Sequence, residues 1–243
     1  MKLLIVIPAR YASTRFPGKP LALIAGRSLV ERVYRNCAKV RNAKVIVATD
    51  DTRILKHVRA FGGEAMMTSE RHPSGTDRAA EVARRHACEV VINVQGDEPL
   101  LLASVVRKIA DAMFREKKLE MATLAHPIKK TQDYQDPNVV KVVLDHNGDA
   151  LYFSRAPIPF FRGSRTQDPG SSHRHIGIYA YRRSFLLRYV KWPQSFLEKA
   201  EKLEQLRALE RGVKIRVLKT SYEAIGVDVP SDVRKVERLL KRR

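Results

Sequence analysis

The sequence predicts an α/β fold, with a mostly parallel sheet flanked by helices and an inserted mixed sheet. The first half of the chain alternates short runs of β-branched residues with stretches of helical periodicity. Residues from about 121 to 182 instead hold strand-like runs around a hairpin signal. The 243 residues are 44% hydrophobic and 30% charged, which suits one soluble globular unit. We therefore expect a single domain over 1–243 with an inserted sheet at about 121–182.

Strands and helices are expected in strict alternation through the first half. Runs rich in Val, Ile and Leu predict buried strands at 3–7, 44–48, 64–67 and 90–94. Periodic apolar residues predict helices at 28–40, 52–61, 74–86 and 103–118. This alternation is typical of parallel strands joined by crossover helices.

The second half is expected to be richer in strands. Strand-like runs occupy 121–128, 139–145, 151–155, 175–182 and 214–218. The turn-forming residues 145–149 predict a hairpin between two of these runs. The polar stretch 162–172 predicts a loop. Helices are expected at 197–211, ended by Gly212, and from Pro230 to about Lys241.

Charge and cysteine content limit the classes of function. The net charge of +20 favours anionic partners, but Lys and Arg are scattered over most helices, so no specific nucleic-acid site is expected. Cys37 and Cys88 form no metal-type pair, which favours a reducing cytoplasm. No apolar run is long enough to insert into a membrane. Walker, dinucleotide-fingerprint, zincin and serine-hydrolase motifs are also missing from the sequence.

A basic loop follows the first predicted strand. Arg10, Arg15 and Lys19 lie on this Gly- and Pro-bounded segment, at the carboxyl end of the strand. Ligands bind at that edge of an open α/β sheet. Several fixed cations suit a polyphosphate, whose dense negative charge needs more than one positive partner. The alternative is an ordinary basic surface loop.

Two aspartates are candidate ligands for Mg²⁺. Asp97 lies in a Gly- and Pro-containing turn after the strand at 90–94, on the same expected edge as the basic loop. Mg²⁺ is often shared between carboxylates and substrate phosphates. Asp228 precedes the last helix and is a second candidate. Alternatively, Asp97 is an ordinary turn residue and Asp228 a helix-start acid.

Two further groups of residues have a functional and a structural interpretation. Ser74 and Thr76 stand at a helix start, where the exposed amides could read a nucleobase, although Ser and Thr are also common helix caps. Arg155, His175, Glu204 and Gln205 offer one cation, one imidazole that could switch its charge, and two polar groups. That mixture suits a hydroxylated, carboxylated sugar, but each residue also has a structural alternative, such as a salt bridge or a solvated helix face.

Taken together, these motifs resemble those of the 3-deoxy-manno-octulosonate (Kdo) cytidylyltransferase family. The matching stretches are IPARYASTRFPGKPL at 7–21, SGTDR at 74–78, NVQGDEP at 93–99, VVKVVLD at 139–145, ALYFSRAPIP at 150–159, RHIGIYAYR at 174–182, LEQLRALERG at 203–212 and GVDVPSD at 226–232. They cover nearly the whole chain in the family order. Val229 departs from the usual Thr, which removes a hydroxyl beside Asp228.

The resemblance implies a nucleotide-diphospho-sugar transferase-like fold, a homodimer and a nucleotidyltransferase reaction. CTP and Kdo would give CMP-Kdo and pyrophosphate for lipopolysaccharide core synthesis. Arg10, Arg15 and Lys19 would hold the triphosphate, Ser74, Gly75 and Arg78 would contact cytosine or its surroundings, Asp97 and Asp228 would bind Mg²⁺, and Gln95, Arg155, His175, Tyr179, Glu204 and Gln205 would line the Kdo pocket. Arg10, Lys19, Asp97 and Asp228 would form the catalytic set.

Two rival interpretations stay open. A cytidylyltransferase for another acidic sugar, such as a sialic acid or 8-amino Kdo, would share the CTP residues and differ only in the sugar pocket. A basic RNA- or DNA-binding module would bind polynucleotides with steep salt dependence.

Overall fold

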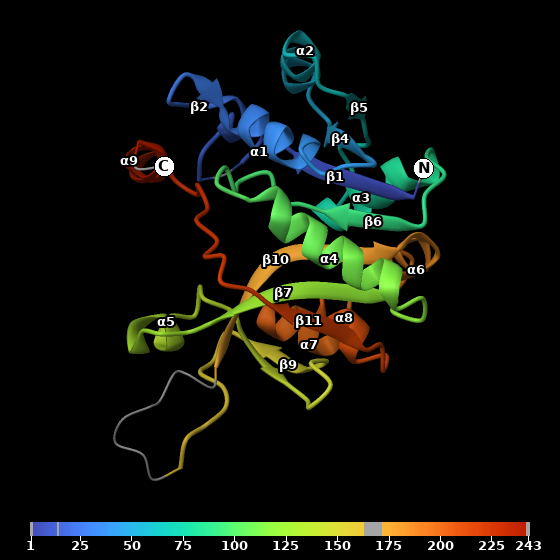
Figure 1. The fold of residues 1–243 in the computed structure, drawn as a ribbon, viewed down its shortest axis with the longest axis vertical. Coiled ribbons are helices and arrows are strands. Elements are labelled where there is room, and N and C mark those ends of the chain that lie inside the picture. The colour runs from blue at the N-terminus through green and yellow to red at the C-terminus, as the bar shows by residue number, and fades with distance from the viewer. Residues whose placement is uncertain (1, 14, 163–171, 242–243) are drawn as a thin grey trace. The chain divides into compact units, whose positions relative to one another are not determined.

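The computed structural model describes residues 2–13, 15–162 and 172–241 (Figure 1). The chain divides into two compact units, unit 1 formed by Met1–Asp111 and Ala224–Arg243, and unit 2 formed by Ala112–Glu223. Most of the loop expected at 162–172 lies outside the described residues. Among the described residues, no helix has the length and apolar character needed to cross a bilayer.

The sheet of unit 1 is parallel, as the alternation predicts. Strand β1 (Leu3–Ala9) lies between β4 (Ala43–Thr49) and β6 (Val90–Asn93), and β5 (Ala65–Met67) pairs with the other side of β4. The side chains from Leu4 to Ile7 are fully buried. A central strand covered on both faces explains why its sequence is continuously apolar instead of alternating.

Helices connect these strands close to the expected positions. They are α1 (Leu29–Ala38), α2 (Thr52–Ala60), α3 (Gly75–Arg84) and α4 (Ala103–Arg115), of which the last continues into unit 2. Ser28, Asp51 and Ser74 cap the first three by accepting a hydrogen bond from a backbone N–H of the first turn. Each helix begins one residue after its cap, so α1 and α3 start one residue later than predicted, while α2 starts at the predicted Thr52.

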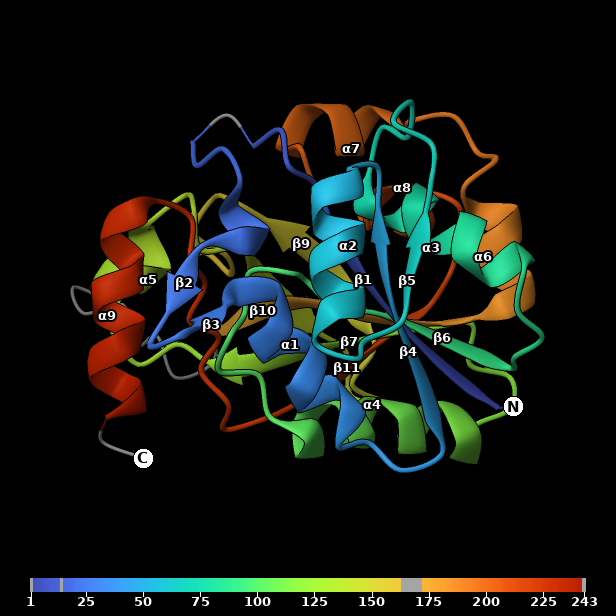
Figure 2. The same ribbon diagram turned by 90° about the horizontal axis from the view of Figure 1, so that it is seen from above.

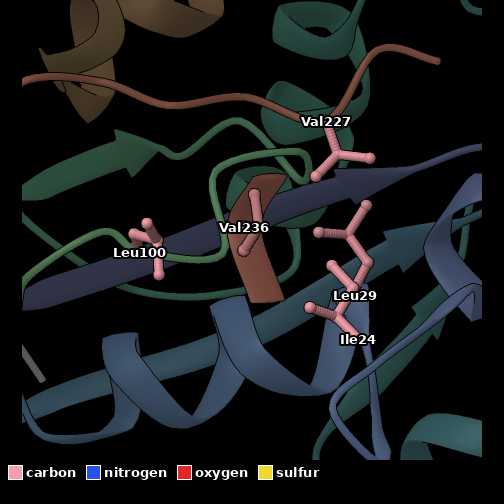
Figure 3. Close-up of a cluster of buried hydrophobic side chains, with 5 residues drawn as sticks. All are labelled: Ile24, Leu29, Leu100, Val227 and Val236. Atoms are coloured by element: carbon pink, nitrogen blue, oxygen red, sulfur yellow. The ribbon is translucent and has the colours of Figure 1, made fainter. Parts of the chain in front are cut away.

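Unit 1 also contains a small hairpin that the sequence pattern did not predict. The short helix η1 (Lys19–Leu21) leads into β2 (Leu23–Ile24) and β3 (Arg27–Ser28), and the last helix α9 (Pro230–Leu240) lies beside this hairpin (Figure 2). The Glu237 carboxylate accepts a hydrogen bond of 2.8 Å from the backbone N–H of Ala25. Ile24, Leu29, Leu100, Val227 and Val236 form one buried apolar cluster, which joins α9 to the hairpin and to α1 (Figure 3).

The sheet of unit 2 is mixed, as expected. Strand β7 (Met121–Pro127) pairs in parallel with β11 (Ile215–Lys219) and antiparallel with β10 (His173–Arg182). Strand β8 (Lys141–Leu144) pairs antiparallel with both β10 and β9 (Ala150–Ser154). The strand expected at 214–218 therefore joins this sheet, although it lies outside the range 121–182.

The hairpin between β8 and β9 confirms the turn prediction. The Asp145 carboxylate accepts hydrogen bonds of 2.8 Å from the backbone N–H groups of Asn147 and Asp149. Gly148 has a φ of +80°, a conformation in which other side chains are strained. An Asp that folds back on its own turn and a Gly at the left-handed position together explain why this pentapeptide reverses the chain.

The single long helix predicted at 197–211 is wrong. Unit 2 instead has α7 (Phe196–Glu201) and α8 (Leu206–Leu209), with Lys202 between them in the left-handed region at φ 54°. In one continuous helix, residues 198 and 207 would be about 13.5 Å apart along the axis. Here the Arg207 guanidinium donates to both carboxylate oxygens of Glu198, at 2.7 and 2.5 Å, and both side chains are buried. That buried ion pair folds the two short helices together. Helices α5 (Thr131–Gln135) and α6 (Arg183–Tyr189) were not predicted.

Candidate active site

The carboxyl ends of the parallel strands of unit 1 meet at one edge of its sheet. Arg10 directly follows β1, and the loop from Gln95 to Asp97 begins two residues after β6. A Cβ atom on Gly96 would lie only 2.8 Å from the carbonyl oxygen of Pro8. This approach leaves no room for a side chain, so glycine lets the loop that carries Asp97 pass close to the end of β1.

Asp97 and Asp228 converge on one ammonium group, although 131 positions separate them in the sequence. Lys19 Nζ lies 3.0 Å from Asp97 Oδ2 and 3.6 Å from Asp228 Oδ1. Arg15 Nη2 lies 3.3 Å from the same Asp228 oxygen. The backbone N–H of Val227 also donates to the carbonyl of Asp97 at 2.9 Å, which fixes the two segments to each other.

This cluster is polar and open on one side. The Lys19 side chain is 16% exposed, while those of Asp97 and Asp228 are 31% and 52% exposed. Among the described residues, no group of three or more His, Cys, Asp and Glu side chains could hold a metal ion. The acidic side chains that meet Lys19 here are the two carboxylates of Asp97 and Asp228. This set suits an ion such as Mg²⁺, which completes its octahedral shell with water and substrate phosphate oxygens.

Local contacts hold the basic loop in shape. Arg10 donates a hydrogen bond of 2.7 Å to the carbonyl of His72. The guanidinium of Arg53 lies 3.3 Å from the centre of the Tyr11 ring, and Gly18, with a φ of +71°, approaches the same ring. The carbonyl of Tyr11 accepts hydrogen bonds of 2.9 Å from the backbone N–H groups of Ser13 and Gly18, so the loop closes on itself.

The three residues expected near cytosine have structural partners. The hydroxyl of Ser74 caps α3 and also donates a hydrogen bond of 2.7 Å to Asp77, as the helix-cap alternative predicts. A Cβ atom on Gly75 would be 3.3 Å from the ring of Pro8, so a small residue is needed there. Arg78 is fully buried and forms an ion pair of 2.6 Å with Asp50.

Five of the six residues expected at the sugar pocket lie in unit 2, and Gln95 lies in unit 1. His175 and Tyr179 flank an irregularity in β10, where the pairing with β7 jumps from Ile176 to Tyr179. In a regular strand, residues four positions apart are about 13 Å apart. The His175 and Tyr179 rings are only 5.3 Å apart, because this β-bulge takes up two residues and shortens the distance between two positions that share one face of the strand.

Thr123 on β7 fills the bulge. Its hydroxyl lies 2.9 Å from the carbonyl of Ile178, 3.1 Å from that of Ile176 and 3.0 Å from Nε2 of His175. Because carbonyls only accept, this geometry favours a hydroxyl that donates to a carbonyl and accepts from His175 Nε2–H. Burial lowers the pKa of His175 to about 3. The expectation of an imidazole that switches its charge is therefore wrong at neutral pH.

Buried polar atoms without a hydrogen-bond partner gather among these residues. Within the described part of the chain, the hydroxyl of Tyr179 and the amide nitrogen of Gln205 are two of the few such atoms. Burial raises the pKa of Tyr179 well above its ordinary value of 10, and the charges of Tyr181 and Glu204 add to the rise. Buried polar groups are rarely left unpaired in proteins, so these atoms are candidates for ligand contacts.

Arg155 at the end of β9 is tied to its own unit. Its Nε donates to the carbonyl of Glu201 at 2.7 Å, and Nη1 donates to the carbonyl of Pro137 at 3.0 Å. The Glu201 carboxylate accepts from the backbone N–H of Arg155 at 2.9 Å. Lys141, which is fully buried, donates to the carbonyl of Arg155. The guanidinium is thus held in a fixed orientation.

Sequence reasoning missed four residues that support the site: Asp50, Arg53, Thr123 and Glu201. Asp50 directly follows β4, so the rule that ligand-binding residues follow parallel strands could have found it. The other three act through contacts between segments remote in the sequence, and no local pattern marks them.

Comparisons with known proteins identify the family of this chain. A family model described as Cytidylyltransferase matches residues 4–215. The 3-deoxy-manno-octulosonate cytidylyltransferase of Geotalea daltonii is 50% identical over 100% of both chains. That of Geobacter sulfurreducens is 49% identical over 99% of this chain and 100% of its own.

Solved structures give the same result. The structure of CMP:2-keto-3-deoxy-manno-octonic acid synthetase complexed with CTP has a TM-score of 0.94 and 43% identity, and covers 100% of this chain and 99% of its own. A 4-diphosphocytidyl-2C-methyl-D-erythritol synthase from Anaerococcus prevotii shares the fold, with a TM-score of 0.64 at 16% identity and 99% of both chains covered. The chain belongs to the 3-deoxy-manno-octulosonate cytidylyltransferase family of nucleotidyltransferases.

Proposed function

We propose that this protein transfers CMP from CTP to the anomeric hydroxyl of Kdo, giving CMP-Kdo and pyrophosphate for lipopolysaccharide core synthesis. Relatives of that name are about half identical to this chain over its full length. The observation that carries the proposal to the level of residues is the convergence of Asp97 and Asp228 on Lys19. These three residues come from three of the matching stretches, 7–21, 93–99 and 226–232, and they meet at the edge of the unit 1 sheet where ligands bind in such folds.

Arg10, Arg15 and Lys19 bind the triphosphate in this proposal. The side chains of Arg15 and Lys19 already meet at Asp228, and Arg10 follows the neighbouring central strand. Ser74 and Gly75 bring the start of α3 toward the cytosine, and Arg78 supports this segment from inside through Asp50. The backbone N–H groups at the start of the helix are then the groups that meet the base.

Asp97 and Asp228 are the proposed ligands of Mg²⁺. Their two carboxylates already share one cationic partner, and hard oxygen ligands of this kind are those that Mg²⁺ takes beside phosphates. When bound, the ion would withdraw charge from the α-phosphate and from the attacking hydroxyl.

The remaining chemistry depends on positioning and charge. The anomeric hydroxyl attacks the α-phosphorus in line, and pyrophosphate leaves without a covalent enzyme intermediate. Arg10 and Lys19 offset the negative charge that grows on the leaving pyrophosphate. Lys19 is well suited to this role because only 16% of its side chain is exposed. Electrostatic interactions are stronger where water is excluded.

Gln95, Arg155, His175, Tyr179, Glu204 and Gln205 form the proposed sugar-binding set. The fixed guanidinium of Arg155 suits the carboxylate of a 2-keto acid sugar. The neutral imidazole of His175 and the buried polar atoms of Tyr179 and Gln205 suit sugar hydroxyls.

A homodimer and a cytoplasmic location are part of the proposal. Family resemblance is the support for the dimer. The two cysteines, Cys37 and Cys88, form no disulfide, which fits a reducing compartment.

The test is pyrophosphate release from CTP with Kdo, 8-amino Kdo and N-acetylneuraminate as acceptors, with and without Mg²⁺. We expect Kdo to give the highest kcat/KM, and EDTA to abolish release until Mg²⁺ is restored. Preference for N-acetylneuraminate would overturn the choice of sugar. Release that persists in EDTA would overturn the role of the metal.

A further inference from the structure

Unit 1 contains a cavity that the proposed reaction does not use. Its volume is about 530 Å³, within the range of pockets that hold small molecules. The walls come from α1, from the end of α2 at Phe61 and Gly62, from Pro99 and Leu100, and from Leu240 near the end of α9. The residues of the phosphate site, Arg10, Lys19, Asp97 and Asp228, are not among its lining residues.

Four cations line this cavity: Arg27, Arg32, Arg35 and Lys39. Glu31 is the carboxylate that pairs with them, and it is shared by Arg35 at 2.7 Å and Arg27 at 3.9 Å. Arg32 donates instead to the carbonyls of Ile24 and Ala25, at 2.7 and 2.8 Å. These partners leave the wall with an excess of positive charge.

The neighbouring charges act on one another. Burial lowers the pKa of Arg32, and the positive charge of Arg27 lowers it further, while Glu31 and Glu237 act in the opposite direction. Lys39 has as its partner the neutral amide oxygen of Asn36, at 3.5 Å. Like charges held together in this way are stabilised by an anion that binds between them.

The rest of the wall is apolar and aromatic. Arg35 lies 5.7 Å from the centre of the Phe61 ring, and the partly buried Leu240 contributes aliphatic surface. A cation next to an aromatic ring offers a stacking surface together with a charge. The cavity therefore combines cations, which bind a phosphate group, with an apolar and aromatic wall, which binds a ring attached to that phosphate.

We propose that this cavity is a second ligand site of the protein, which binds a small phosphorylated molecule with an apolar or aromatic ring. The phosphate contacts Arg27, Arg35 and Lys39, and the ring packs on Phe61 and Leu240. The site is separate from the one that binds CTP in the proposed reaction.

The cavity wall is connected to both carboxylates of the proposed metal site. The side-chain amide of Asn36 donates a hydrogen bond of 3.0 Å to the carbonyl of Pro99, two residues after Asp97. Leu100 packs in the same apolar cluster as Val227, which precedes Asp228 (Figure 3). A ligand that moves Pro99 and Leu100 thus acts on the segments that carry Asp97 and Asp228, so occupancy of the cavity changes turnover.

The experiment measures binding of 1-naphthyl phosphate to the full chain by calorimetry, in the presence of saturating CTP and Mg²⁺. We expect binding to persist with CTP, and the double variant Arg27→Glu, Lys39→Glu to weaken it by about tenfold or more, the scale of losing charged hydrogen-bond partners. The matched control is Lys56→Glu, an exposed charge on α2 outside the cavity, which should change the affinity less than about twofold.

Three outcomes would overturn the proposal. If CTP displaced 1-naphthyl phosphate, the probe would be bound in the CTP site and not in the cavity. Equal affinity for the probe in the double variant and in the wild type would show that Arg27 and Lys39 do not bind it. Inorganic phosphate that binds as tightly as the probe, while 1-naphthol does not bind, would mean an adventitious ion only. The coupling is tested by kcat at saturating probe, and an unchanged kcat in wild type would refute it.

Discussion

The proposed phosphate site of unit 1 and the unit 2 residues of the proposed sugar-binding set are built in opposite ways. The first consists of charged side chains that pair across an open edge, with Asp228 about half exposed. The second places the fixed guanidinium of Arg155 with aromatic rings and buried polar groups, and burial keeps His175 uncharged. This difference in charge and burial matches two different tasks, binding a polyphosphate and selecting a sugar. A polyphosphate is held by charges that can exchange partners, whereas a sugar is distinguished by fixed hydrogen bonds in a dry setting.

The largest effect expected on the charged side of this comparison comes from Asp97→Asn. An amide of the same shape removes the negative charge, so turnover should fall at least roughly 10²-fold, while the fold is kept. Steady-state kinetics over a range of Mg²⁺ concentrations measures it. Asp111→Asn, an exposed carboxylate on α4, is the matched control and should keep wild-type activity. A variant that turns over normally at limiting Mg²⁺ would show that charge at residue 97 is not needed.

A smaller effect is expected in unit 2 from Arg155→Lys. The charge remains, but the forked geometry that spans a carboxylate is lost, so the KM for Kdo should rise about tenfold with little change for CTP. Arg188→Lys, a half-exposed Arg paired with Glu120, is the control in the same unit. Equal changes in both KM values would mean that Arg155 acts on the fold of the site and not on the sugar.

An effect on stability, not on activity, is expected from pH. The pKa of His175 is about 3 in the folded protein and near 6.5 in the unfolded chain. Below pH 6.5 the unfolded chain therefore binds a proton that the folded protein does not, and stability falls as the pH falls. Between pH 7 and pH 5 the loss from this residue should be about 1–2 kcal/mol.

Urea denaturation at pH 7 and pH 5 measures this loss, with His175→Gln for comparison. The variant should lose less stability over the same interval, because Gln does not titrate. Identical losses in both proteins would mean that His175 is accessible to protons in the folded state, and the contrast between the two regions would weaken.

The sequence was a better guide to unit 1 than to unit 2. Alternating apolar runs and periodic helices are local signals, and they were enough to predict the parallel strands and the edge that carries Arg10 and Asp97. The break at Lys202 could not be read in the same way. Lysine favours helices, and the break depends on the buried pair of Glu198 with Arg207, which exists only after the chain has folded.

The candidate site shows the same limit. The sequence offered Asp97 and Asp228 as candidate ligands, but no local pattern links residues so far apart, and the family resemblance favoured their pairing. The sequence also offered helix capping for Ser74, and the structure bears that out. The neutral state of His175 was missed, because the extent of burial follows from packing and not from the residue type.

The bulge of β10 has a consequence for how the proposed sugar pocket can evolve. It adds two residues to β10 between the positions that pair with Leu124 and Thr123 of β7. Because side chains alternate across a strand, an even number of added residues leaves the rest of β10 facing the same way. The pocket can therefore change by steps of two residues while the core of unit 2 is preserved, whereas a single insertion would turn the strand inside out. Relatives with different sugars are expected to differ in length here by zero or two residues.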